Sequence, residues 1–103
     1  MIAGVFATAL GDSSTATGNR TVSVDAKAKA DESIAIGSAS TSEGIRSIAI
    51  GANATATNES ATVVGTHSTA DIRGTVIGAE SMAYNHGFAG GYQAKASGES
   101  STA

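Results

Sequence analysis

The side chains that could carry out chemistry are few and widely spaced. The two histidines, His67 and His86, have no cysteine or carboxylate at a spacing typical of metal ligands. The chain contains no Cys, and none of its many serines lies in a Gly-x-Ser-x-Gly motif or beside a His/Asp pair that could activate it. We therefore predict that the protein is not an enzyme and uses no metal, cofactor or small-molecule substrate. Both histidines are expected to be exposed loop residues.

Cations and aromatic residues are the other side chains that could contact a ligand. The candidate ligand contacts are Lys27, Lys29, Arg46, Arg73 and Tyr84. The four cations could contact an acidic ligand, or they could simply keep the protein soluble and prevent edge-to-edge association. Tyr84 lies near Phe88 and Tyr92, and this aromatic group could be a contact region or could fill space where Gly90 replaces a larger residue.

Composition limits the protein to one small domain with a thin core. The chain has 103 residues, a net charge of −3 and 41% hydrophobic residues. Half of that hydrophobic set is alanine, and Gly, Ala, Ser and Thr together make up 60 of the 103 residues. Because large side chains contribute roughly 1.5–3 kcal/mol each on burial, a thick two-layer globule is not expected. The mild acidity argues against nucleic acid as a partner, and no run of about 20 apolar residues predicts a membrane span.

An internal repeat of 12 to 14 residues runs through the whole chain. Its clearest copies are Ser33–Ser42 (SIAIGSASTS) and Ser47–Ala56 (SIAIGANATA). One anchor position defines the register, with Asp25 in the second copy. The anchor glycines are Gly11, Gly37, Gly51, Gly65, Gly78 and Gly91. Each is expected to form a tight turn with positive φ, which glycine adopts without steric cost and Asp tolerates better than most residues.

Apolar residues alternate with period two, so each repeat predicts two short strands on either side of the glycine turn. A larger aliphatic residue precedes each anchor except the last. This ladder consists of Leu10, Val24, Ile36, Ile50, Val64 and Ile77. We expect the two strands of a coil to approach through Ala and Ser at the third and fifth positions after the anchor, around the aliphatic ladder. Differences in coil length are expected in the loop after the fifth position.

The predicted fold is therefore all-β, a parallel β-solenoid of about seven flattened coils. Coils stacked about 4.8 Å apart would satisfy their main-chain hydrogen bonds and give a rod roughly 35 Å long. A 13-residue coil encloses little volume, so one chain alone buries a small apolar area. A second apolar stripe shared among three chains would raise the buried fraction, and we expect a homotrimer.

The units at 33–42 and 47–56 resemble the head repeats of trimeric autotransporter adhesins, the YadA-like head. A weaker copy at Thr75–Ala83 and the shared register extend the likeness over essentially the whole chain. The resemblance implies a left-handed parallel β-roll, three chains side by side, on the extracellular side of a bacterial outer membrane. It also implies attachment to host matrix proteins such as collagen, fibronectin or laminin, autoagglutination and biofilm formation.

Nothing in the sequence resembles the neck, coiled-coil stalk or membrane β-barrel of that family. We therefore expect residues 1–103 to be a single head-repeat domain excerpted from a longer chain.

Three alternatives share parts of this pattern. A trimeric phage tail fibre could use the same coils to recognise a bacterial surface. An ice-binding β-solenoid would need an unbroken Thr ladder. Thr15 and Thr17 are matched by Thr55 and Thr57, but elsewhere the same columns hold Lys29/Asp31, Met82/Tyr84 and Lys95/Ser97. A left-handed β-helix acyltransferase would need about 18 residues per coil as three hexapeptide faces, and the 12-to-14-residue period excludes it.

Overall fold

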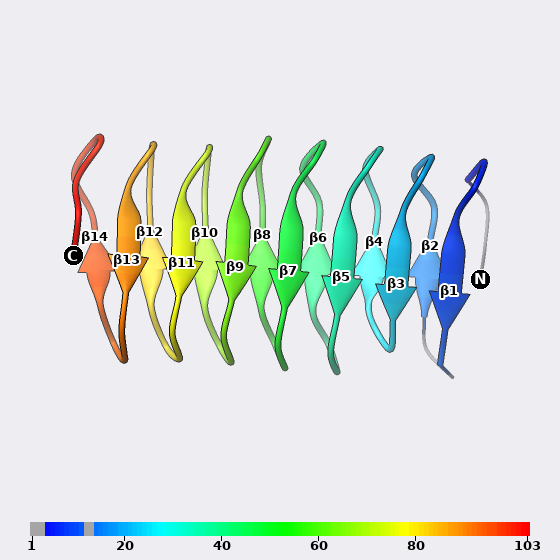
Figure 1. Ribbon diagram of the computed structural model, residues 1–103, viewed down its shortest axis with the longest axis horizontal. Helices are drawn as coiled ribbons and strands as arrows, with labels where there is room; N and C mark the ends of the chain where they lie inside the picture. Colours follow the sequence, from blue (N-terminus) through cyan, green and yellow to red (C-terminus); the bar gives the residue numbers. More distant parts are fainter. Residues whose placement is uncertain (1–3, 12–13) are drawn as a thin grey trace.

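The computed structural model describes residues 4–11 and 14–103, and strands are the regular elements in this part of the chain. They alternate between two parallel sheets of seven strands (Figure 1). The first sheet contains β1 (Thr8–Leu10), β3 (Val22–Val24), β5 (Ile34–Ile36), β7 (Ile48–Ile50), β9 (Thr62–Val64), β11 (Thr75–Ile77) and β13 (Phe88–Gly90). The second sheet contains β2 (Thr15–Ala16), β4 (Lys27–Ala28), β6 (Thr41–Ser42), β8 (Thr55–Ala56), β10 (Thr69–Ala70), β12 (Met82–Ala83) and β14 (Lys95–Ala96). No helix in the described ranges is long and apolar enough to cross a lipid bilayer.

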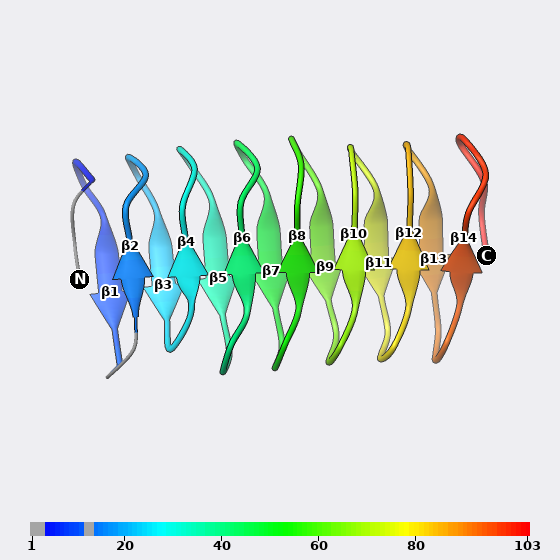
Figure 2. The same cartoon turned by 180° about the vertical axis from the view of Figure 1, so that it is seen from behind.

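The chain winds as a left-handed parallel β-roll. In Figure 1 each coil runs down the near sheet, crosses below, runs up the far sheet, and advances by one strand toward the C-terminal end. Figure 2 shows the second sheet from the other side, with its strands in the same order. The Cα extents are 36 × 20 × 11 Å, in agreement with a rod of stacked coils about 4.8 Å apart. The predicted all-β roll is confirmed.

Main-chain hydrogen bonds between coils set the register. Ile36 pairs with Ile50 in β5 and β7, and the N–H of Gly51 donates to the Ile36 carbonyl at 2.8 Å. The anchor glycines have φ between 111° and 154°, and Asp25 has φ 52°. A Cβ on Gly51 would also lie 2.6 Å from the Gly65 carbonyl oxygen. Glycine is therefore needed at this turn for both its backbone conformation and its close approach to the next coil.

Small side chains fill the space between the two sheets. The middle residue of each first-sheet strand and the last residue of each second-sheet strand point inward, as Ala49 and Ala56 do with no exposed surface. Val63 and Val76 are the largest fully buried side chains in the described part of the chain. The remaining fully buried positions are almost all Ala and Ser, so the two backbones of a coil lie close together.

The aliphatic ladder lies on the outside of the roll, and the structure differs here from the expectation that each coil closes around it. Ile36 is 36% exposed, Ile77 51% and Leu10 65%, while Val24, Ile50 and Val64 lie in the same outward column. Side chains in a strand alternate between faces. Because the inward place belongs to the small residue two positions before the anchor, the branched residues on either side of it must point out.

The second coil is shortened at its glycine turn, not in the loop where length changes were expected. Only Asp25 and Ala26 separate β3 from β4, whereas four residues separate β5 from β6. Lys27 pairs with Thr15 and Thr41, and Ala28 with Ala16 and Ser42. Ala28 therefore lies in the column of inward residues with Ala16 and Ser42, where counting five residues from Asp25 had predicted Ala30.

The coils that run from Gly65 to Gly78 and from Gly78 to Gly91 have 13 residues each, and they are shortened in the loop where length changes were expected. This loop leads from the second sheet back to the first, and it has four residues at 71–74 and 84–87 but five at 43–47.

The narrow interior predicts a strong asymmetry between inward and outward substitutions. Ala49→Leu should lower the free energy of unfolding by about 1–3 kcal/mol because three extra heavy atoms must fit between closely packed sheets. Thr55→Leu, on the outer face of β8, should change it by less than about 0.5 kcal/mol. Urea denaturation followed by circular dichroism measures both. Equal losses for the two variants would contradict the inward placement of Ala49.

Candidate functional site

The outer face of the first sheet is apolar along most of the rod. Two columns of side chains point outward from it, one at the first and one at the last residue of each strand. The first column is Thr8, Val22, Ile34, Ile48, Thr62, Thr75 and Phe88, and the last is Leu10, Val24, Ile36, Ile50, Val64, Ile77 and Gly90. We call these residues the apolar face. Contiguous exposed apolar surface of this kind marks an interaction site.

The outer face of the second sheet is polar. One outward column is Thr15, Lys27, Thr41, Thr55, Thr69, Met82 and Lys95. The residues that follow the strands, Thr17, Lys29, Glu43, Thr57, Asp71, Tyr84 and Ser97, form the next column. We call these residues the polar face. Three threonines, Thr41, Thr55 and Thr69, are consecutive in the first column, but Lys27 and Met82 end the run at either side.

The candidate ligand contacts fall on two different parts of the surface. Lys27, Lys29 and Tyr84 belong to the polar face, whereas Arg46 and Arg73 lie in the row of turns that leads from the second sheet back to the first. The structure thus separates these five residues along and around the rod and does not gather them into one site.

Most of these cations already have partners on the adjacent coil. Lys29 pairs with Glu43 at 3.5 Å and Arg46 with Glu59 at 3.2 Å. The Arg73 guanidinium lies 3.1 Å from the His86 ring nitrogen Nε2. Lys27 makes no ion pair among the described residues.

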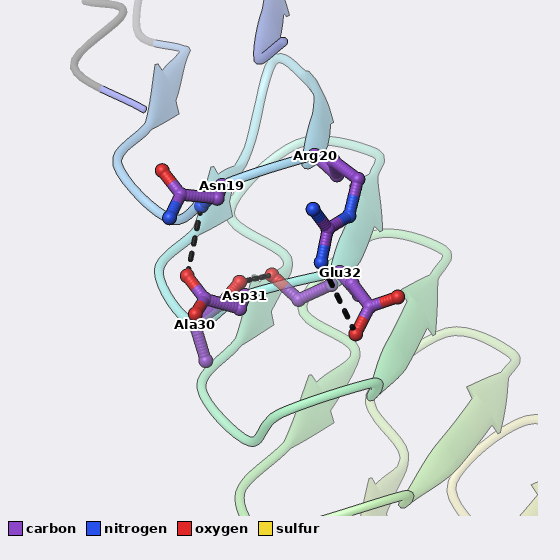
Figure 3. A network of polar contacts seen from close by, with 6 residues as sticks. Asn19, Arg20, Ala30, Asp31 and Glu32 are labelled. Carbon is purple, nitrogen blue, oxygen red and sulfur yellow. Dashed lines mark hydrogen bonds and ion pairs between the residues drawn. The ribbon is translucent and has the colours of Figure 1, made fainter. Parts of the chain in front are cut away.

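A ladder of polar contacts runs along the row of turns that leads from the second sheet back to the first. The main-chain N–H of Asn19 donates to the Asp31 carboxylate at 2.9 Å, and Arg20 pairs with Glu32 at 3.8 Å (Figure 3). Farther along, the side chains of Thr57 and Asn58 donate to Asp71. All of these contacts join one coil to the next and are largely exposed, so they align the turns and contribute little to stability.

The aromatic residues do not form one cluster. The Tyr84 hydroxyl lies 3.9 Å from the Met82 sulfur on the polar face. Phe88 belongs to the apolar face, where its ring lies 3.0 Å from the place that a Gly90 Cβ would take. Phe88 therefore covers the gap left by Gly90, but from outside the coil and not as an interior plug. Tyr92 is 68% exposed in the last glycine turn.

The histidines are exposed turn residues on opposite rows of turns. The His67 ring nitrogen Nε2 lies 3.2 Å from the Asn53 side-chain amide, and His86 contacts Arg73. The described part of the chain has no group of three His, Cys, Asp or Glu residues that could hold a metal ion.

Sequence reasoning missed which side of the first-sheet strands faces the interior, and it missed the shortened turn of the second coil. A signal for the second point was present in Ala26-Lys27-Ala28-Lys29, where alanine alternates with lysine. Because lysine is almost never fully buried unless paired, this run identifies the alanines as the inward residues of the second sheet. It also identifies the two-residue turn before Lys27.

Comparison with known proteins identifies the class of this fold. The family model of the YadA head domain repeat matches residues 3–24, 24–40, 28–54, 42–68 and 89–103. The structure is similar to the solved collagen-binding domain of the Yersinia adhesin YadA, with a TM-score of 0.92 and 26% sequence identity over 96% of this chain. The chain spans 63% of the length of that domain. A search of curated protein sequences gives no match.

The matched segments cover well over half of the 103 residues. The chain belongs to the family of YadA head domain repeats.

The exposed ion pairs predict a small, salt-dependent contribution to stability. Arg46→Ala removes the contact to Glu59 and should lower the free energy of unfolding by about 0.2–1 kcal/mol at low ionic strength. The loss should diminish at 1 M NaCl, where the Debye length is about 3 Å. Denaturation at both salt concentrations measures this, with Arg46→Lys as the charge-preserving control. A larger, salt-independent loss would mean that Arg46 is needed for packing.

Proposed function

We propose that this chain is the head of a bacterial surface adhesin that attaches to host extracellular matrix, collagen above all. The observation that carries the proposal is the structural likeness, over nearly the whole chain, to a solved collagen-binding domain of an adhesin. The rod also presents long regular surfaces suited to binding rather than to catalysis. In this proposal residues 1–103 form one head-repeat domain on the extracellular side of the outer membrane.

We further propose that three copies associate through the apolar face. Each roll alone buries mostly Ala and Ser, while its larger aliphatic side chains remain on the outside. Burying apolar surface contributes about 25 cal/mol per Å², so covering the columns that contain Ile36, Ile50 and Ile77 would supply stability that one roll lacks. A homotrimer covers them with the same face of neighbouring chains and leaves the polar faces turned outward.

The polar face is then the surface available to matrix ligands. It is shallow and repetitive, with Thr41, Thr55 and Thr69 at its centre and Lys27 and Lys29 toward one end. Such a surface offers many weak contacts that add through multivalency. Collagen, fibronectin and laminin are the matrix ligands we propose, and contacts between heads on neighbouring cells would account for autoagglutination and biofilm formation.

A charge on the apolar face should break the trimer. Ile36→Asp places a carboxylate in the middle of the proposed interface, and sedimentation velocity should show a monomer where the unchanged chain sediments as a trimer. Thr41→Asp, on the polar face of the same coil, is the matched control and should remain trimeric. Circular dichroism checks that both variants keep their β-structure. A monomeric unchanged chain, or a trimeric Ile36→Asp variant, would refute the apolar face as the interface.

Matrix attachment should depend on surface density and on the polar face. Retention on immobilised collagen should rise by about 10²–10⁴ between sparse and dense coupling of the trimer. Thr55→Glu should weaken retention because it adds a charge to the centre of the polar face.

Asn53→Glu is the control for the collagen experiment. It makes the same charge change in the adjacent turn, where Glu80 already occupies the equivalent place with φ 58°. Surface plasmon resonance at several coupling densities measures retention. Density-independent retention, or equal losses for both variants, would argue against this surface.

A further inference from the structure

The second coil leaves a notch in the row of glycine turns. Only Asp25 and Ala26 lie between β3 and β4, where the regular coils have four residues such as Gly51–Ala54. The cavity at this place has a volume of about 430 Å³. Its lining residues are Asp25, Ala26, Lys27, Ser38, Ala39, Ser40 and Thr41. The notch is therefore the space that two further turn residues of the second coil would occupy.

One main-chain donor on the wall of this notch lacks its usual acceptor. In the fourth to seventh coils, the N–H of the third residue of the glycine turn donates to the carbonyl of the second turn residue of the preceding coil, at 2.8–2.9 Å. These bonds are Asn53 to Ser38, His67 to Ala52, Glu80 to Thr66, and Gln93 to Ala79. Ala39 holds the corresponding place in the third coil. Because the second coil lacks a second turn residue of this kind, no such carbonyl is available among the described residues.

A buried hydroxyl lies next to this open donor. Ser40 is 1% exposed, and its Oγ has no hydrogen-bond partner in the described part of the chain. In the same column the Ser68 hydroxyl donates to the Gly78 carbonyl at 2.6 Å and accepts the N–H of Ser81 at 3.1 Å. Both of these partners belong to the coil that follows Ser68, so the corresponding partners of Ser40 lie in the fourth coil and not in the notch. The N–H of Ala39 is therefore the hydrogen-bonding group that the shortened second coil leaves without an acceptor.

The charges around the notch define the kind of ligand. Lys27 supplies a cation with no ion pair among the described residues, and Asp25 supplies a carboxylate. Opposite charges at one cavity favour a neutral dipolar group over an anion such as sulfate or phosphate. The alanine side chains of Ala26 and Ala39 are small enough to admit a main chain.

We propose that this notch binds a main-chain amide of a peptide ligand. The ligand carbonyl accepts the Ala39 N–H and replaces the missing carbonyl of the second coil, while the ligand N–H donates to Asp25. The ligand thereby completes the row of inter-coil hydrogen bonds in the manner of the regular coils. This inference stands apart from matrix adhesion, because it concerns one site on the roll and is testable in solution without any matrix protein.

Titration of the full chain with N-acetylglycine N-methylamide, followed by ¹H–¹⁵N correlation spectra, tests the proposal. The amide signals of Ala39 and Ser40 should shift saturably, with a dissociation constant on the order of 1 mM for so small a ligand. Amide hydrogen exchange at Ala39 should be faster than at Asn53, His67 and Glu80, and the probe should slow it.

Two variants decide whether the shifts report the notch. Asp25→Gly combined with insertion of Ala-Asn before Ala26 gives the second coil the turn of Gly51–Ala54, and it should abolish the shifts and protect the Ala39 amide. Lys27→Thr should weaken binding several-fold. Lys95→Thr makes the same change in the same column far from the notch, and it should have no effect.

Each remaining outcome overturns the proposal. Absence of a saturable shift would mean that water alone fills the notch. Shifts that persist in the insertion variant would place the probe elsewhere. Equal or stronger saturable shifts with N-acetylglucosamine would assign the notch to a sugar acetamido group and not to a peptide.

Discussion

The close approach of the two strands within each coil is the constraint on which the rest of the structure depends. Coils stacked through parallel main-chain hydrogen bonds satisfy the backbone, but the shortest extent of the molecule is only 11 Å between Cα atoms. Only small side chains fit inside such a layer, which explains why Ala and Ser occupy nearly every buried position. The glycine turns follow from the same geometry, since a Cβ on Gly51 would collide with the backbone of the next coil.

A thin interior forces the larger apolar side chains outward, and this gives the roll two unlike faces. Ile36 and Ile50 cannot lie beside Ala49 inside the coil, because neighbours in a strand point to opposite sides. The apolar face is therefore a direct consequence of the alanine interior and does not arise as a separate feature. A protein with this division has its strongest driving force for association on one sheet and its ligand-accessible polar groups on the other.

The architecture could be predicted from the sequence, because the period, the anchor glycines and the alternation of residues all point to stacked flat coils. The direction of the side chains could not be predicted from the SIAIG units alone. Ser47 to Ile50 alternates equally well with either face inside, and the usual preference for burying isoleucine favours the wrong one. The surface was less predictable still. Whether Lys29 and Arg46 are free or paired depends on Glu43 and Glu59 in the next coil, and those contacts exist only once the register is fixed.

Where a coil departs from the repeat, the chemical groups exposed at that place differ from those along the rest of the rod. Regular coils present the same groups again and again, and in the fourth to seventh coils the N–H of the third turn residue is bonded to the coil before it. Where the second coil has two residues fewer, the hydrogen bonds of the strands continue through Lys27 and Ala28, so the fold tolerates the change. The shortened turn supplies no acceptor for the Ala39 N–H, which is left without a main-chain partner among the described residues. In a structure built from nearest-neighbour contacts, a shortened coil thus changes its neighbours on the adjacent coil more than it changes itself, and a distinct site arises on a surface that is otherwise uniform.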